Sequence, residues 1–300
     1  MELAPVVLFC YNRLSLLQQT VTCLQQNPLA ADSTLIVFVD GPKSTNDDLP
    51  KVQAVRDFVK QITGFKHLII HESTTNSGLA KSVIAGVSQV FESYDKAIVM
   101  EDDLLCSSDF LLFMNQALTR YTNDPLICSV TGYIYPFPIP TSYTKDVLLI
   151  PRGSSWGWGT WKDRWQQTDW EVQDFASFLT SPDQKREFTK AGPDLLPMLI
   201  KQRRGLIQSW AVRWTYHHYK TGTYCLHPTK SKITHIGYDG SGTNEHSLRG
   251  GEIYETAVVF PDTILPDQAV IRNVYRYFSP SLYRRVINWH RYNINPFTLV

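Results

Sequence analysis

The chain has 300 residues, 43% of them hydrophobic, and its 29 basic and 28 acidic residues leave a formal net charge of +1. This length and apolar content suit one large globular unit, and the balanced charge gives no bulk field for nucleic acid. The five cysteines are widely spaced without a C-x-x-C pair, which argues against a disulfide framework and a zinc site. No basic leader precedes the first apolar run and no run approaches roughly 18 residues, so we expect a cytoplasmic protein, soluble or peripheral.

Strand and helix patterns alternate through the first 130 residues. Apolar, β-rich runs predict strands at residues 5–11, 34–39, 67–71 and 96–100. Helical periodicity predicts helices at residues 15–26, 49–63, 79–94 and 110–118. This alternation predicts a mostly parallel sheet with helices on both faces, and ligands bind such sheets at the carboxyl ends of the strands. The polar segments at those ends are Tyr11–Arg13, Asp40–Gly41, Asn76–Lys81 and Glu101–Asp103.

Three consecutive acids, Glu101, Asp102 and Asp103, follow the apolar run of residues 97–100. Such a cluster also fits a solvated turn before a helix, with Ser107 to Asp109 as capping residues. However, adjacent carboxylates repel one another, and a cation neutralises them. Oxygen ligands favour Mg²⁺ or Mn²⁺, which typically combine one or two carboxylates with substrate phosphates.

Five of the eight tryptophans fall within residues 156–170. Aromatic rings flanked by glycine are suited to stacking on sugars, whereas Trp161 and Trp165 are spaced as on one buried helix face. We therefore assign Trp156 and Trp158 to the site and the other three to the core. Further along, residues 183–204 have a helical pattern, residues 223–227 resemble a strand, and residues 235–246 form a glycine-rich loop.

Four segments in this order resemble the GT-A fold nucleotide-sugar glycosyltransferases, the nearest likeness being N-acetylglucosaminyltransferase I and related bacterial sugar transferases. They are Phe9–Arg13, Val39–Gly41, Glu101–Leu104 and Pro228–Thr243. The resemblance covers roughly residues 5–246. It implies a GT-A, Rossmann-like α/β fold with a mostly parallel sheet: a nucleotide-sugar-binding half (1–130), an acceptor-side half (131–262) and a basic aromatic tail (263–300).

The resemblance also implies residue roles. Asp103 would bind the metal, Asp102 the ribose hydroxyls and Glu101 the donor sugar, with Mn²⁺ or Mg²⁺ as cofactor. Asp40 can accept from a uracil imide, and the positive charges of Arg13 and Lys81 suit the diphosphate. The donor site is therefore expected to comprise Tyr11, Asn12, Arg13, Asp40, Lys81, Glu101, Asp102, Trp156 and Trp158.

The remaining catalytic parts are less defined by the sequence. His235 and His246 flank the late loop and could complete the coordination of the metal, with His246 as the second candidate ligand. An inverting transferase needs a carboxylate base, yet residues 201–219 contain no acid. Our candidates for the base are Asp163 and Asp239. Whether the reaction inverts or retains configuration stays open.

The segment from Arg272 to the end holds five arginines interleaved with aromatic residues and contains no acid. Arginine with Tyr, Trp and Phe suits an anionic membrane surface, and the alternative is a helix docked on the catalytic domain. Pro280 argues against one long helix.

The leading interpretation is a metal-dependent glycosyltransferase that moves a sugar from a nucleotide diphosphate donor, expected to be UDP-linked, to a glycan or lipid-linked acceptor in surface polysaccharide synthesis. It would sit on the inner face of the membrane if peripheral. The alternatives are a non-catalytic nucleotide- or sugar-binding module and a sugar-phosphate nucleotidyltransferase. The absence of glycine from the opening LFCYNRLSLL disfavours the nucleotidyltransferase.

Overall fold

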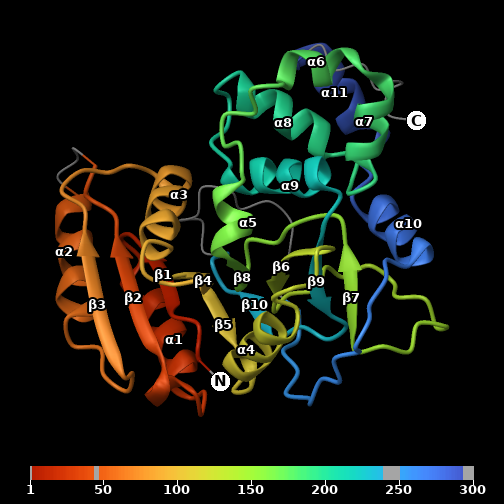
Figure 1. Ribbon diagram of the computed structural model, residues 1–300. Helices are drawn as coiled ribbons and strands as arrows, with labels where there is room; N and C mark the ends of the chain where they lie inside the picture. The colour runs from red at the N-terminus through yellow and green to blue at the C-terminus, as the bar shows by residue number, and fades with distance from the viewer. Residues whose placement is uncertain (1, 44–46, 239–250, 293–300) are drawn as a thin grey trace.

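The computed structural model describes residues 2–43, 47–238 and 251–292, and its centre is an eight-stranded sheet (Figure 1). The strand order is β3-β2-β1-β4-β8-β6-β9-β7. In chain order these strands are β1 (Val6–Cys10), β2 (Thr34–Val39), β3 (His67–Glu72), β4 (Lys96–Glu101), β6 (Ile127–Thr131), β7 (Val147–Ile150), β8 (Trp158–Trp161) and β9 (Tyr224–Pro228). A second, two-stranded sheet pairs β5 (Leu104–Cys106) with β10 (Ile233–His235).

Helices cover the sheet and build the upper part of the molecule in Figure 1. They are α1 (Leu14–Gln25), α2 (Asp48–Val59), α3 (Leu79–Val90), α4 (Phe110–Arg120), α5 (Lys162–Gln166), α6 (Phe175–Thr180), α7 (Pro182–Thr189), α8 (Leu195–Arg203), α9 (Trp210–Thr221), α10 (Gln268–Tyr277) and α11 (Leu282–Tyr292), with a 3-10 turn η1 (Ala30–Asp32). The helix expected at residues 183–204 is thus two helices, α7 and α8.

Strand directions confirm the predicted fold class. Strands β2 and β4 run parallel to β1, and β3 runs parallel to β2. Because β8 is antiparallel to both β4 and β6, β6 points the same way as β4; β9 is parallel to β6, and β7 opposes β9. In the described part of the sheet, β8 and β7 are therefore the strands that oppose β1, and the sheet is mostly parallel.

The inner parallel strands β1 and β4 are buried on both faces because helices cover both. Along β1, Val6 and Leu8 belong to the core shared with α1, α2 and α4, whereas Val7 and Phe9 belong to the core shared with α3. Alternation of side chains along a strand produces this division. Gly86 on α3 permits close contact with the sheet, since a Cβ there would lie 2.7 Å from Phe9 Cε1.

The register of β8 against β4 determines which of the tryptophans are buried in the core. Trp158 pairs with Val99 of β4, and its side chain is 1% exposed, with its ring centroid 4.9 Å from Trp210 and 5.6 Å from Trp165. The structure therefore places Trp158 in the core and not at the ligand site, because this side chain points into the helix-covered face of the sheet. Trp161 and Trp165 are buried, as predicted, but they do not share a helix face: Trp161 ends β8, Trp165 is in α5, and the two belong to different core clusters.

The sheet continues through the expected boundary at residue 130, which lies within β6. Helices α6 to α9 share a separate apolar cluster. Arg152 ties this region to α10: it donates two hydrogen bonds of 2.8 Å to Asp194, and its guanidinium lies 3.7 Å from the centroid of the Phe278 ring. The C-terminal segment is not one long helix, as expected from Pro280, and forms α10 and α11 on either side of it. Among the described residues, no helix is long and apolar enough to cross a membrane.

Candidate functional site

An arginine and two acids meet where β1 and β4 end. Phe9 of β1 pairs with Glu101 of β4, so the residues that follow these two strands are neighbours. Arg13 Nη2 donates to Asp103 Oδ2 at 2.6 Å and also forms an ion pair with Asp102 Oδ1. The Tyr11 backbone N–H donates to the other Asp102 oxygen at 3.3 Å. The structure thus brings together two of the expected strand-end segments.

Burial and neighbouring charges give the three acids of this cluster different pKa values. Burial raises the pKa of Glu101 to about 8, with a further contribution from the neighbouring charges of Asp103 and Asp102. Burial also raises the pKa of Asp102, to about 6, against the lowering effect of Arg13. Burial acts to raise the pKa of Asp103 too, but hydrogen bonds from His235 and Arg13 outweigh it and hold this pKa below its usual range. Asp103 is therefore the most acidic of the three.

His235 completes the cluster from the other end of the chain. Because β10 pairs with β5, His235 lies opposite Leu104, and its Nε2 is 3.1 Å from Asp103 Oδ2. Trp156 stacks on the imidazole with ring centroids 4.9 Å apart and an interplanar angle of 9°. The sequence analysis named His235 with His246 as able to complete the coordination of a metal, but did not place it against Asp103. The missing signal is the pairing of β5 with β10, a long-range contact that local patterns do not encode.

Asp48, which the sequence analysis did not select, fixes the loop that follows β1. Tyr11 donates its hydroxyl hydrogen to Asp48, and Asn12 Nδ2 donates to Asp48 Oδ1 at 2.7 Å. The backbone N–H of Lys43 donates to the same carboxylate at 2.6 Å. Asp48 is 6% exposed and opens α2, so it anchors Tyr11 and Asn12 to the helix after β2. The side chains of Tyr11 and Asn12 are thereby positioned and not free.

Asp40 joins the end of β2 to the start of α3. Its Oδ1 accepts from the backbone N–H groups of Gly41 and Ser77, both at 2.9 Å, and its Oδ2 accepts from Gly78 at 3.0 Å. Residue 41 must be glycine for this close approach, because a Cβ there would lie 2.4 Å from the Thr75 carbonyl carbon. Asp40 is therefore a structural bridge in this state, whatever it binds in addition.

Two side chains approach the beginning of α3. Lys81 is on its first turn and is exposed. Gln208, directly before α9, brings its Oε1 to 3.6 Å from the Cβ position of Gly78. The segment of residues 201–219, which contains no acid, thus lies next to the start of α3 at Gln208.

The candidate bases are not gathered with the acidic cluster. Trp161 pairs with Lys96 at the amino end of β4, so Asp163, two residues later, follows the opposite edge of the sheet. Its carboxylate pairs with Arg164 at 2.9 Å and is 63% exposed. Asp239 and His246 lie outside the described residues.

The chemistry of the cluster fits a divalent cation shared with a ligand. Asp103 Oδ1 and His235 Nδ1 are buried and have no hydrogen-bond partner. Within the described part of the chain, no three His, Cys, Asp or Glu side chains are grouped to hold a metal. The protein therefore offers one carboxylate and one imidazole, and the remaining ligands of Mg²⁺ or Mn²⁺ would be phosphate oxygens and water.

No protein-family model and no curated protein matches the sequence. Solved structures with a similar fold include mannosyltransferase PcManGT from Pyrobaculum calidifontis in complex with GDP-Man and Mn²⁺, at 15% identity over 54% of this chain and 46% of that one, with a TM-score of 0.38. Another is S. aureus TarS in complex with UDP-GlcNAc, at 11% identity over 77% of this chain and 58% of that one, with a TM-score of 0.41. A third is GalNAc-T7 with UDP, GalNAc and Mn²⁺, at 13% identity over 78% of this chain and 44% of that one, with a TM-score of 0.47.

The chain therefore spans 44–58% of the length of these three solved structures. At this identity the likeness extends to the fold alone, and with each TM-score below 0.5 no residue role is taken from these proteins.

Proposed function

We propose that the chain is a glycosyltransferase that binds a nucleotide diphosphate sugar, with UDP as the nucleotide, at the carboxyl ends of β1 and β4. The observation that carries this proposal is the meeting of Arg13, Asp102, Asp103 and His235 at that edge of a mostly parallel sheet. Ligands bind such sheets at this edge, and a cluster of acids with one unpartnered carboxylate oxygen is suited to a cation bound with a diphosphate.

The residues at this edge would divide the work as follows. Asp103 would hold Mn²⁺ or Mg²⁺, and His235 is the second side chain within reach of the same carboxylate. The bound cation supplies Lewis-acid stabilisation of the charge that develops on the departing diphosphate. Arg13 keeps Asp102 and Asp103 charged in a partly buried place and is available to the phosphates. Asp102 would accept hydrogen bonds from ribose hydroxyls and Glu101 would contact the sugar.

The search for a catalytic base leads to a second candidate function. Asp163 follows the opposite edge of the sheet, and residues 201–219 contain no acid. Asp239 is therefore the base we propose. If no base is present, either the transfer retains configuration or the chain is a binding module that takes up a nucleotide sugar without transferring it.

Turnover with a panel of nucleotide sugars tests both readings. Release of the nucleoside diphosphate is measured with Mn²⁺ or with excess EDTA, with and without a mixture of glycan acceptors. The glycosyltransferase proposal expects metal-dependent release that rises with an acceptor and is lost in Asp239→Asn. Metal-dependent binding without release would establish the binding module. If no nucleotide sugar binds at all, both proposals fail.

For the acceptor we propose a glycan or a lipid-linked sugar at an anionic membrane surface. Helix α11 directs Leu282, Tyr283, Val286 and Trp289 outward, with exposures of 79%, 77%, 54% and 52%. Arg284 is exposed beside them, and Asn288 is buried within hydrogen-bond distance of Lys201 on α8. An apolar face bordered by arginine on a docked helix is suited to the interface of a bilayer. The docked-helix alternative and membrane contact are thus compatible.

A further inference from the structure

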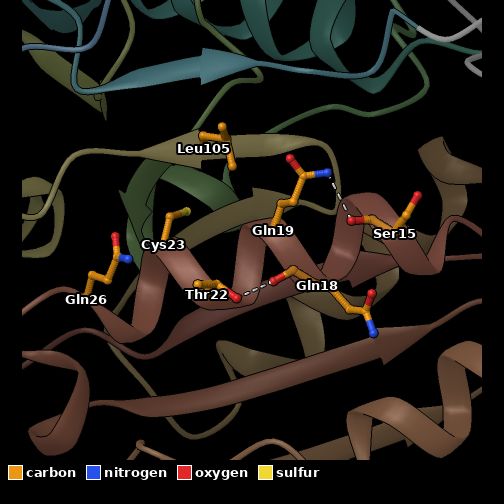
Figure 2. A pocket seen from close by; sticks show the side chains of 7 residues that line it. All are labelled: Ser15, Gln18, Gln19, Thr22, Cys23, Gln26 and Leu105. Carbon is orange, nitrogen blue, oxygen red and sulfur yellow. Dashed lines mark hydrogen bonds between the residues drawn. The ribbon is translucent and has the colours of Figure 1, made fainter.

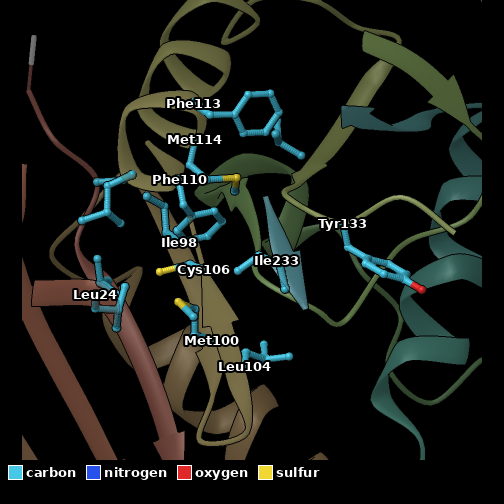
Figure 3. Packing of buried hydrophobic residues seen from close by; sticks show 14 of the residues in the cluster. Leu24, Ile98, Met100, Leu104, Cys106, Phe110, Phe113, Met114, Tyr133 and Ile233 are labelled. Carbon is cyan, nitrogen blue, oxygen red and sulfur yellow. The ribbon is translucent and has the colours of Figure 1, made fainter. Parts of the chain in front are cut away.

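Two cysteines from distant parts of the sequence lie next to each other beneath the acidic cluster. Cys23 is on α1 and Cys106 is on β5, and their sulfur atoms are 3.3 Å apart. All five cysteines are free thiols and buried. Figure 3 shows the Cys106 side chain between apolar residues such as Ile98 and Ile233. The packing of α1 against β5 holds the pair together, so the contact does not depend on a mobile loop.

The surroundings make the two thiols unequal. Cys23 lines a surface pocket of about 340 Å³ between α1 and Leu105, formed otherwise by serine, threonine and glutamine side chains (Figure 2). Its sulfur accepts hydrogen bonds from the Cys106 thiol and from the Cys106 backbone N–H at 3.2 Å. The Cys106 hydrogen bond lowers the pKa of Cys23, whereas burial raises that of Cys106. Cys23 is therefore the more nucleophilic and the more accessible thiol.

We propose that Cys23 and Cys106 are a redox-active dithiol that a hydroperoxide converts to an intramolecular disulfide. The Cys23 thiolate attacks the terminal oxygen of the hydroperoxide, so that an S–O bond forms and the O–O bond breaks. Cys23 is oxidised to a sulfenic acid, and the departing alkoxide or hydroxide takes up the proton that the thiol released, giving an alcohol or water. Cys106 then attacks that sulfur, the S–O bond breaks, and water leaves with the Cys106 proton. Overall, two thiols and one hydroperoxide yield one disulfide, one alcohol and one water.

The geometry permits this bond with a small movement. The sulfurs must approach from 3.3 Å to the roughly 2.05 Å of a disulfide, a shift within reach of side-chain rotation and slight helix movement. The crosslink would join the helix that follows Arg13 to the strand that follows Asp103. Thr20 of α1 already donates to the Asp102 carbonyl at 2.9 Å, so the new bond would reinforce an existing contact under the acidic cluster.

Peptide mapping of the native full-length protein tests the proposal. Trypsin places Cys23 in residues 14–43 and Cys106 in residues 97–120, each as the single cysteine of its peptide. After treatment with hydrogen peroxide at equimolar concentration and quenching by iodoacetamide, we expect a crosslink between these two peptides, loss of mass equal to two hydrogen atoms, and full reversal by dithiothreitol. A melting curve of the treated protein verifies that it is folded during the reaction.

Three cysteine variants, two as tests and one as a control, are treated in the same way. Cys23→Ser and Cys106→Ser must each abolish the crosslink, and the dimedone adduct of a sulfenic acid must persist in Cys106→Ser and be absent from Cys23→Ser. Cys128→Ser, which alters another buried thiol, must leave the crosslink intact. Crosslinking only after denaturation, irreversible oxidation of Cys23 without a crosslink, or pairing of either residue with a different cysteine would overturn the proposal. The outcome is independent of any transferase activity.

Discussion

Arg13 donates to Asp103 at 2.6 Å, so the acid that we propose as a metal ligand already has a positive partner from the protein itself. The same guanidinium pairs with Asp102, and the other oxygen of Asp103 has no partner. A cation can therefore bind Asp103 Oδ1 while Arg13 retains Oδ2, and both positive groups offset the negative charge of the acidic cluster and of a diphosphate.

Asp103→Asn should remove metal-dependent UDP binding and leave the fold intact. A neutral amide is a poor ligand for a hard cation, and the loss should exceed the roughly 1.5 to 3 kcal/mol of one hydrogen bond to a charged group. Folding should survive because Arg13 keeps its contact with Asp102. Calorimetric titration with UDP and Mn²⁺ measures the effect, with Asp183→Asn, a change at an 84% exposed carboxylate on α7, as the matched control. Unchanged affinity in Asp103→Asn would remove the metal assignment.

Asp40→Ala should lower both stability and UDP affinity. The substitution deprives the N–H groups of Gly41, Ser77 and Gly78 of their acceptor, at a cost of about 1 to 3 kcal/mol in the free energy of unfolding. We expect a loss of similar size for UDP if the carboxylate also meets the uracil imide. Denaturant unfolding measures the first effect. For the second, wild-type protein should bind CDP more weakly than UDP, and equal affinities would exclude the uracil contact.

The predicted strands of the first half agree with the structure to within one residue at each end. The strand predicted at residues 34–39 is β2 over the same range, because the segment is rich in β-branched residues and a polar turn follows it. Local patterns therefore locate Asp40, Asp102 and Asp103 at the carboxyl edge. Local patterns do not predict which segments lie next to each other. The contacts of Arg13 with Asp103 and of Tyr11 with Asp48 depend on the register of β1 against its neighbours.

The parts of the site that the sequence did not predict depend on the long-range topology of the sheet. Strand β8 inserts antiparallel between β4 and β6, and this reversal puts Trp156 beside His235 but carries Asp163 to the other edge. Trp156 and Trp158 are only two positions apart, yet the first stacks on His235 and the second is buried among tryptophans. Aromatic composition alone cannot distinguish these environments, because it contains no information on which strand lies next to which.

Three buried histidines should make the protein sensitive to mild acid. Burial lowers the pKa of His217 and of His227 to about 4 and that of His218 to about 3. The unfolded chain binds protons at these rings below about pH 6.5, whereas the folded protein does not until near pH 4. Stability should therefore be full above about pH 6.5 and fall as the pH drops towards 4, by on the order of 2 kcal/mol for each histidine at about pH 5.

A variant isolates one of these contributions. The His217 ring stacks on Trp214 with centroids 5.3 Å apart, so His217→Phe retains an aromatic ring without a titrating group. Unfolding by urea at about pH 7.5 and pH 5 should show a difference in stability that is smaller by about 2 kcal/mol in this variant. The control is His67→Gln, at an exposed position on β3, which should leave the difference unchanged. An identical pH dependence in His217→Phe and wild type would contradict the assignment.

Helix α11 should bind anionic vesicles through its outward face. Replacing Leu282, Val286 and Trp289 by serine should abolish vesicle binding with little effect on the melting temperature, because these side chains are already at least half exposed. Arg284→Ala should weaken binding by about 1 kcal/mol, an effect that fades as salt screens the surface charge.

The matched control is Val259→Ser with Leu265→Ser, at side chains that are 73% and 62% exposed outside α11. Removal of the whole tail is less informative, since Val270 and Val274 of α10 are buried and their loss would uncover the core. Co-sedimentation at low and high salt decides the matter: if the triple serine variant pellets with vesicles as well as wild type does, α11 does not contact the membrane.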